Sequence, residues 1–209
     1  MADLPELEHS SLRQELHDLK RCQIIFLQLS VTATGILLGL AVRWNMAKLF
    51  EYIYLLPLII VLPSWWIFFD KATTITRIVG YYRIVEKMIL GKLHPPRKWS
   101  GWENSLGLFR KEGERVTIPK IEKKTSEFIK LIFLQKPFRY WMIIYYTFFG
   151  LSLICWFLTL LQKPSICVWL IGLGAIGFTA YWNLRIVYQL VLGRYSYDNN
   201  QKIWEEILK

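Results

Sequence analysis

The sequence predicts an all-α integral membrane protein with four transmembrane helices, together with amphipathic helices in the cytosol or at the membrane interface. Apolar residues make up 54% of the 209 residues and charged residues only 20%, whereas about a quarter of the residues in soluble domains are charged. Four runs contain no Asp, Glu, Lys or Arg, and they cover residues 22–42, 52–69, 140–162 and 164–184. Each run is close to the roughly 20 residues that a helix needs to cross a bilayer.

The positions of Lys and Arg predict the orientation of these spans. The segments between spans one and two and between spans three and four carry only Arg43, Lys48 and Lys163, so 23 of the 26 basic residues lie elsewhere. Because basic loops stay on the cytoplasmic side, we expect both termini and the 70–139 loop to be cytoplasmic. We expect the chain to lie in the plasma (inner) membrane.

These patterns divide the chain into five segments: residues 1–21, 22–92, 93–139, 140–194 and 195–209. The first is expected to be a short amphipathic helix at the membrane interface or at a subunit contact. Ser11 and Gln14 have the spacing of a capping box, and apolar residues recur at helical spacing at Leu12, Leu16 and Leu19.

The first span, residues 22–42, contains Gly35 and Gly39, with Thr32 one turn earlier. Small residues four apart allow two helices in a bilayer to approach closely. The contact could be made within the chain or between subunits.

The second span, residues 52–69, contains Pro57 and Pro63, and each removes a backbone donor from a helix. Broken helices of this kind line sites in transporters, so we take both prolines, Ser64 and Thr32 as pore or kink candidates. A kink with a packing role is the alternative. Trp65 and Trp66 stand at the cytosolic boundary, where tryptophan anchors a helix at the interface.

The helix of span two is expected to leave the membrane and to continue to about Gly91, carrying the basic residues Lys71, Arg77, Arg83 and Lys87. In residues 93–139, Ser100 and Glu103 form a second capping-box pattern. The helix that follows would use Trp99 and Trp102 as interfacial anchors, or dock in a groove of an oligomer. A further helix is expected to begin near Pro119.

Spans three and four are expected to form a hairpin around residues 162–164. Span four matches GxGxxG at Gly172, Gly174 and Gly177. That motif binds dinucleotides only after a strand in a βαβ unit, so here it predicts a helix-packing surface. The chain ends in a short amphipathic helix, in residues 195–209.

The expected spans lack the side chains of enzymatic chemistry. Their interiors contain no His, Glu, Lys or Arg, and Asp70 lies at an edge. The three cysteines, Cys22, Cys155 and Cys167, have no metal-ligand or redox spacing. We therefore expect no enzymatic activity, no cofactor and no metal site.

The net charge of +10 could indicate nucleic acid. A basic layer beside a membrane is instead typical of contact with anionic lipid headgroups, worth about 1 kcal/mol per basic residue. We therefore expect the lipid bilayer and its anionic headgroups as partners, rather than nucleic acid.

Two functional classes remain open. The first, which we place ahead, is a homo-oligomeric channel- or pore-like protein whose basic helices surround the cytosolic mouth. The second is a non-conducting membrane scaffold or anchor that binds anionic lipid or a cytosolic protein partner.

The order of elements in residues 1–92 is a helix, two spans and a cytosolic helix. In this order the chain resembles the SLATT-type membrane effectors of prokaryotic defence systems. The resemblance implies pore formation, and it covers the order of elements alone.

Overall fold

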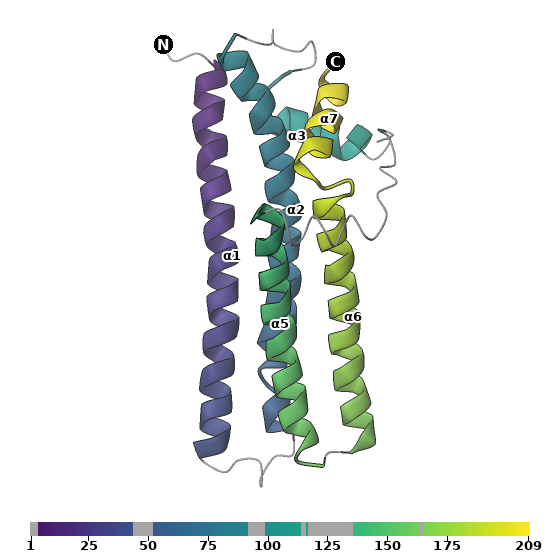
Figure 1. Ribbon diagram of the computed structural model, residues 1–209. Helices are drawn as coiled ribbons and strands as arrows, with labels where there is room; N and C mark the ends of the chain where they lie inside the picture. The colour runs from purple at the N-terminus through teal and green to yellow at the C-terminus, as the bar shows by residue number, and fades with distance from the viewer. Residues whose placement is uncertain (1–3, 44–51, 92–98, 114–115, 117–135, 164) are drawn as a thin grey trace. The chain divides into compact units, whose positions relative to one another are not determined.

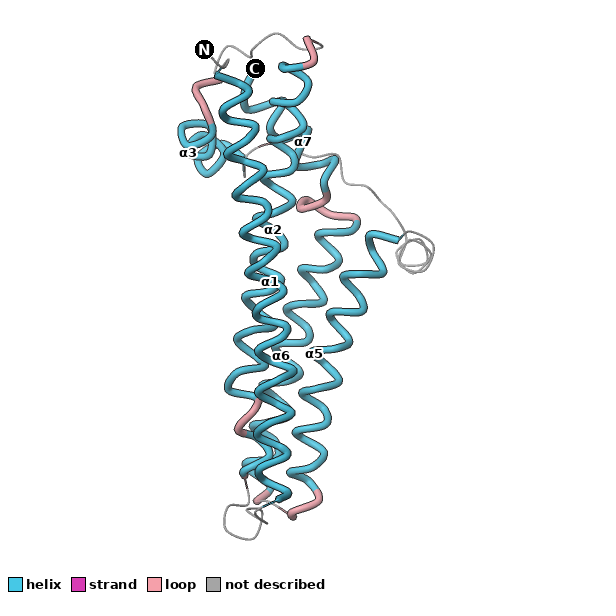
Figure 2. Tube along the Cα trace, turned by 90° about the vertical axis from the view of Figure 1, so that its left-hand side faces the viewer, coloured by secondary structure: helices cyan, strands magenta, loops and turns pink. Residues whose placement is uncertain are grey.

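The computed structural model describes residues 4–43, 52–91, 99–113, 116, 136–163 and 165–209 (Figure 1). These ranges form helices and turns without a strand, which confirms the all-α prediction (Figure 2). The elements are α1 (Leu4–Arg43), the 3₁₀ helix η2 (Ile53–Leu55), α2 (Leu58–Ile89), α3 (Trp102–Glu112), α5 (Lys136–Leu160), α6 (Ile166–Val191) and α7 (Tyr197–Leu208). The helix expected near Pro119 lies outside the described residues.

Among the described residues, four stretches of helix are long and apolar enough to cross a membrane, and each overlaps one of the four expected spans. They are Pro5–Arg43, Ile53–Ile89, Arg139–Leu160 and Ile166–Val191. The shortest has 22 residues, and a bilayer core of ~30 Å needs about 20 residues of helix.

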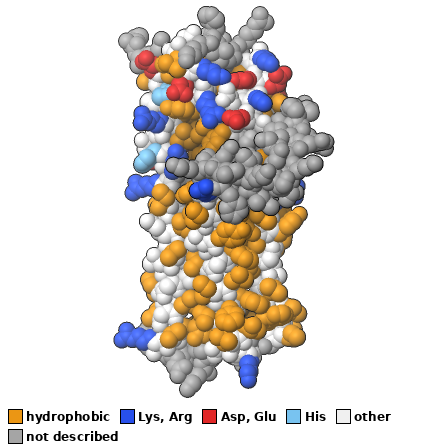
Figure 3. All heavy atoms as spheres, viewed as in Figure 1, with side chains coloured by type: hydrophobic (Ala, Val, Ile, Leu, Met, Phe, Trp, Pro, Cys, Tyr) orange, Lys and Arg blue, Asp and Glu red, His pale blue; other side chains and the backbone are white. Residues whose placement is uncertain are grey.

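The chain divides into two compact units, to which α1, α2 and α6 each contribute. Unit 1 consists of Met1–Arg21, Lys71–Phe128 and Tyr188–Lys209, and unit 2 of Cys22–Asp70 and Ile129–Val187. Unit 1 carries 19 of the 26 basic and 14 of the 16 acidic residues of the sequence. Hydrophobic side chains spread over the visible surface of unit 2 (Figure 3).

The first helix continues through residue 21, where the division between the two units also falls. α1 runs without a break from Leu4 to Arg43, and Ser11 lies exposed in its interior, so Ser11 is not an N-cap. No Gly or Pro stands between residues 6 and 34 to end a helix. The polar first half and the apolar second half of α1 therefore form one continuous helix.

Two further helix starts also differ from the expectation. Pro57 does not interrupt the span, because α2 begins one residue later and Pro57 O accepts hydrogen bonds from Ile60 N at 3.0 Å and Val61 N at 2.9 Å. A proline is well tolerated before the first helical turn. At α3 the N-cap is Gly101, with φ 86° and no side-chain cap, instead of Ser100.

Unit 2 is organised around Trp65 of α2, which is fully buried. Its ring centroid lies 5.1 Å from that of Tyr145 and 6.1 Å from that of Phe148, both on α5. Tyr145 in turn donates a hydrogen bond of 3.0 Å to the carbonyl of Ala180 on α6. α5 and α6 run side by side (Figure 2), and their connection turns at Lys163, whose φ is 54°.

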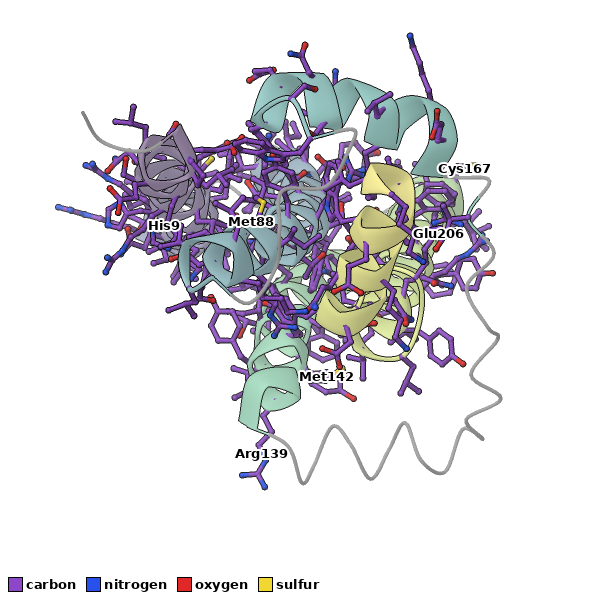
Figure 4. The ribbon with its side chains drawn as sticks, turned by 90° about the horizontal axis from the view of Figure 1, so that it is seen from above. His9, Met88, Arg139, Met142, Cys167 and Glu206 are labelled. Atoms are coloured by element: carbon purple, nitrogen blue, oxygen red, sulfur yellow. The ribbon has the colours of Figure 1, made fainter. Side chains whose placement is uncertain are left out.

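The core of unit 1 is formed by α1, α2 and α7, which are far apart in the sequence. In Figure 4 these helices can be located by the labels His9 on α1, Met88 on α2 and Glu206 on α7. The fully buried members of this core include Leu12, Ile78, Tyr81, Ile84, Val85, Trp204 and Leu208. The Trp204 ring lies 4.9 Å from the Tyr81 ring, and its Nε1 donates a 3.0 Å hydrogen bond to the carbonyl of Arg77.

Gly80 brings α2 and α7 into direct backbone contact. A Cβ at this position would lie 2.9 Å from the carbonyl carbon of Asn200 and 3.0 Å from Gln201 N. Backbone atoms cannot rotate away as a side chain does, so the position requires glycine. Gly80 is not among the glycines predicted from the sequence to pack against another helix.

Replacement of Gly80 by Ala is expected to lower the free energy of unfolding by about 1–3 kcal/mol, the usual effect of overpacking a tight contact. Gly107→Ala is the matched control, because a Cβ at Gly107 meets nothing within 4 Å. That change should leave stability equal or raise it by up to about 1 kcal/mol. Unfolding of the purified chain measures both, and equal stabilities of the two variants would contradict the packing role of Gly80.

Candidate functional site

A pocket in unit 1 collects three arginines, and we call it the arginine pocket. Its volume is about 180 Å³, and the residues that line it include Arg77 of α2, Phe109 and Arg110 of α3, Gly113, Arg194 and Asn200 of α7. Arginine remains protonated in proteins. Three positive charges therefore border one small space, and no Asp or Glu is among the described residues that line it.

Two of the arginines are positioned by contacts with neighbouring elements. The guanidinium carbon of Arg77 lies 4.9 Å from the centroid of the Phe109 ring, which is a cation–π arrangement. Arg194 Nη2 donates a hydrogen bond to the carbonyl of Gly113 at the end of α3. Arg110 is exposed. The pocket is thus built from α2, α3 and the connection between α6 and α7.

Hydrogen bonds of two asparagines hold the connection between α6 and α7 in place. Asn200, only 2% exposed, donates from Nδ2 to Thr76 Oγ1 at 3.3 Å and to the carbonyl of Tyr195 at 3.1 Å. Asn199 Nδ2 donates to the carbonyl of Gly193 at 2.9 Å. Ser196 caps α7 by accepting from Asn199 N. The start of α7 is therefore held against α2 beside the arginine pocket.

The predicted basic helix is present in α2, but two of its four basic residues form ion pairs with α7. Arg83 Nη1 lies 3.0 Å from Asp198 Oδ1, and Lys87 Nζ lies 3.0 Å from Glu205 Oε1. Partial burial raises the pKa of Glu205, but hydrogen bonds from Gln201 and Lys87 and the Lys87 charge together lower it below the ordinary value.

Of the four predicted basic residues only Arg77 lines the arginine pocket, and Lys71 is half-buried elsewhere. Neither Arg110 nor Arg194 is predicted from the sequence as a site residue. Arg110 follows Phe109 on an amphipathic helix, and Arg194 follows Gly193 at a helix end. These local features do not reveal that the two arginines share a pocket.

Trp99 and Trp102, expected as interfacial anchors, instead contact the core of unit 1. Trp99 Nε1 donates a 2.9 Å hydrogen bond to the Tyr81 hydroxyl, and the Trp102 ring lies 5.1 Å from the Tyr81 ring. The Tyr81 hydroxyl donates in turn to Glu8 Oε1 at 3.0 Å. Burial raises the pKa of Tyr81 and, against the hydrogen bond from Tyr81, that of Glu8.

Trp65, also predicted as an anchor, is fully buried with its ring against α5. Trp66 is 40% exposed and stacks at 5.6 Å on Trp182 of α6. Its ring, with Pro63, Leu62, Ile67 and Thr179, lines an open apolar groove of about 370 Å³ in unit 2.

The pore or kink candidates occupy different environments. Pro63 is exposed inside α2, Ser64 beside it is buried, and Thr32 is exposed on α1. Pro57 precedes α2, as described above. The structure does not bring these four residues to one site in the chain.

Four of the five predicted packing glycines face open space. A Cβ at Gly35, Gly39, Gly174 or Gly177 would meet nothing within 4 Å, whereas one at Gly172 would lie 3.4 Å from Trp156 Cδ1. Of these five glycines, only Gly172 packs against another described residue. For the other four, a packing contact between subunits stays a prediction.

Comparison with known proteins gives no match: no family model, no curated protein and no solved structure is significantly similar to this chain. In the part of the chain that the structure describes, no three His, Cys, Asp or Glu side chains are grouped to hold a metal ion.

Glu8→Gln is expected to flatten the pH dependence of stability. Burial raises the folded-state pKa of Glu8 above its ordinary value of 4.5, so the folded chain binds this proton more tightly than the unfolded chain. The stability from this proton is fully present below pH 4.5 and is lost as the pH rises through the higher folded pKa. Gln keeps the acceptor for Tyr81 and does not titrate.

Thermal unfolding between acidic and neutral pH measures the difference. The wild-type midpoint should fall more steeply with rising pH than that of Glu8→Gln. Glu6→Gln, an exposed change on the same helix, controls for the loss of one negative charge. Parallel profiles for wild type and Glu8→Gln would contradict the assignment.

Proposed function

We propose that this chain is a multi-pass integral membrane protein that anchors a charge-rich unit at the cytoplasmic surface, where that unit contacts anionic lipid. The observation that carries the proposal is the segregation of the chain into two units. Unit 1 has 19 of the 26 basic and 14 of the 16 acidic residues, and unit 2 contains the four uncharged runs of the sequence.

Exposed apolar side chains on unit 2 support membrane insertion. Ile36, Ile59, Ile143 and Ile171, from four different helices, are 56%, 70%, 63% and 71% exposed. Soluble monomers rarely present apolar patches larger than a few hundred Å². A bilayer is the solvent that suits such a surface, and helices satisfy their backbone polar groups internally within it.

The orientation follows from the basic residues. Because 23 of the 26 lie outside the two short connections, the positive-inside rule places both termini and unit 1 in the cytoplasm. The plasma (inner) membrane is the proposed location, and anionic headgroups at its cytoplasmic face are the proposed partners. A cytosolic protein partner is compatible with this position, and we propose neither nucleic acid binding nor an enzymatic activity.

Internal pairing of polar groups supports an anchor ahead of a channel. The mouth of a channel would use the charges of Arg83 and Lys87, but both bond to acidic residues of α7. Gln23 donates to the carbonyl of Phe68 at 2.8 Å, and Ser152 donates to the carbonyl one turn earlier on its own helix. These four side chains therefore find their polar partners within one chain, without a second subunit.

The second candidate is the homo-oligomeric channel- or pore-like protein. It is favoured by the glycines at which an added Cβ would meet nothing within 4 Å. Gly35 and Gly39 on α1 and Gly174 and Gly177 on α6 would admit a helix of another subunit. The exposed Thr32 and Pro63 would then face a neighbouring chain or a path. The SLATT-like order of elements agrees with this candidate.

Cysteine labelling in intact cells tests the topology. In a background without Cys22, Cys155 and Cys167, a single cysteine at Gln162 should react with an impermeant reagent, because the 3–4 connection is external. A single cysteine at Ser100 should react only after permeabilisation. Extraction at alkaline pH checks integration, and release of the chain into solution, or the reverse labelling pattern, would contradict the proposal.

Substitution at the open glycines separates the two candidates. If they form a subunit interface, Gly35→Leu and Gly177→Leu should each weaken the oligomer by about 1–2 kcal/mol. Gly150→Leu on α5 is the matched control, since a Cβ there also meets nothing within 4 Å.

Oligomeric state in detergent and current across planar bilayers are the two measurements. An oligomer that dissociates in the α1 or α6 variant, with current in the wild type, favours the channel. An unchanged oligomeric state and no current, also after addition of cell lysate as a source of an activating ligand, favour the anchor.

A further inference from the structure

We infer that the arginine pocket binds a phosphate group. The pocket brings Arg77, Arg110 and Arg194 from three separate segments to one space. The planar guanidinium forms paired N–H bonds that match phosphate oxygens. A phosphate group in this space could accept charge-assisted hydrogen bonds from more than one guanidinium.

The helix ends at the pocket have smaller effects. Asn200 belongs to the first turns of α7, where the positive end of the helix dipole is offset by Asp198 in the first turn. α3 presents its C-terminal end, whose carbonyls repel anions, but Arg194 bonds the carbonyl of Gly113 there. The side chain of Asn200 is 2% exposed, so part of the pocket wall is shielded from water.

The size of the pocket limits the ligand. Its volume of about 180 Å³ is below the roughly 300–1,000 Å³ of pockets for drug-sized molecules. A phosphate group, free or at the end of a larger molecule, suits this space, and a whole nucleotide does not. The phosphate could belong to a lipid headgroup or to a soluble phosphate ester, and only the lipid source rests on the proposed membrane location.

The first arm of the test uses the full chain in neutral detergent and inorganic phosphate as the probe. Phosphate is titrated against chloride at constant ionic strength, with the unfolding midpoint as the readout. A saturable, phosphate-specific rise is expected in the wild type. Arg110→Gln should weaken the apparent affinity by about tenfold, since charge-assisted hydrogen bonds are lost.

Two further variants keep the result interpretable. Arg194→Gln should weaken the response as well, but it also removes the bond to Gly113. Arg110 is exposed, so its change leaves the fold intact. Lys202→Gln removes the same charge from an exposed position of α7 outside the pocket and should respond like the wild type. Equal responses of wild type and Arg110→Gln, or none in the wild type, would overturn the inference.

The second arm identifies the source of the phosphate. The chain is placed in phosphatidylcholine nanodiscs with or without phosphatidic acid, and the phosphate titration is repeated. If a headgroup occupies the pocket, phosphatidic acid should suppress the response to inorganic phosphate in the wild type. If the natural ligand is soluble, the response should persist in both lipids, and either result supports a phosphate site.

Failure of this inference differs from failure of the proposed function. A chain that resists alkaline extraction but shows no phosphate response would overturn the phosphate site and leave the membrane anchor standing. A chain that binds phosphate through Arg110 but is released from membranes would overturn the anchor and leave the phosphate site.

Discussion

The contact of Gly80 with the backbone of α7 is the constraint on which unit 1 depends. Because a Cβ at Gly80 would lie 2.9 Å from the Asn200 carbonyl carbon, α2 and α7 approach more closely than side chains normally allow. That approach lets Trp204 reach both the Tyr81 ring and the carbonyl of Arg77. It also sets the start of α7 beside Arg77, so the packing of two helices and the shape of the arginine pocket have one origin.

Buried polar groups then give the packed helices a defined register. Asn200 bonds Thr76 of α2, Trp99 bonds Tyr81, and Tyr81 bonds Glu8 of α1. Each bond joins segments that are distant in the sequence, and each leaves a costly unpaired group if the segments slip. Among the described residues, Glu8 Oε2 has no hydrogen-bond partner. Unit 1 is therefore specified by polar pairing as well as by apolar area, and it forms only when the first, middle and last parts of the chain meet.

Most of the helical fold could be predicted from the sequence, and most of the candidate site could not. Uncharged runs and their lengths are local properties, so the four long helices and the continuation of α2 were predictable. Both capping boxes were wrong because α1 continues past Ser11 and α3 begins after Gly101. Trp65, Trp99 and Trp102 were placed at an interface because sequence spacing does not tell whether a ring meets lipid or another helix. Arg77 was singled out, but Arg110 and Arg194 join it only through tertiary contacts.

The same contacts change the meaning of the net charge. A value of +10 suggests a uniformly basic surface, yet the ion pairs of Arg83 and Lys87 with α7 neutralise one face of α2. Arg77 lies on the same helix, and it borders a pocket whose described lining has three arginines and no carboxylate. Long-range attraction to a membrane depends on the total charge and is screened over ~8 Å at physiological salt. Selection of one anion depends instead on fixed guanidinium groups that act at hydrogen-bond distance. Specificity would therefore reside in the arginine pocket, and the remaining basic residues would provide attraction without selection.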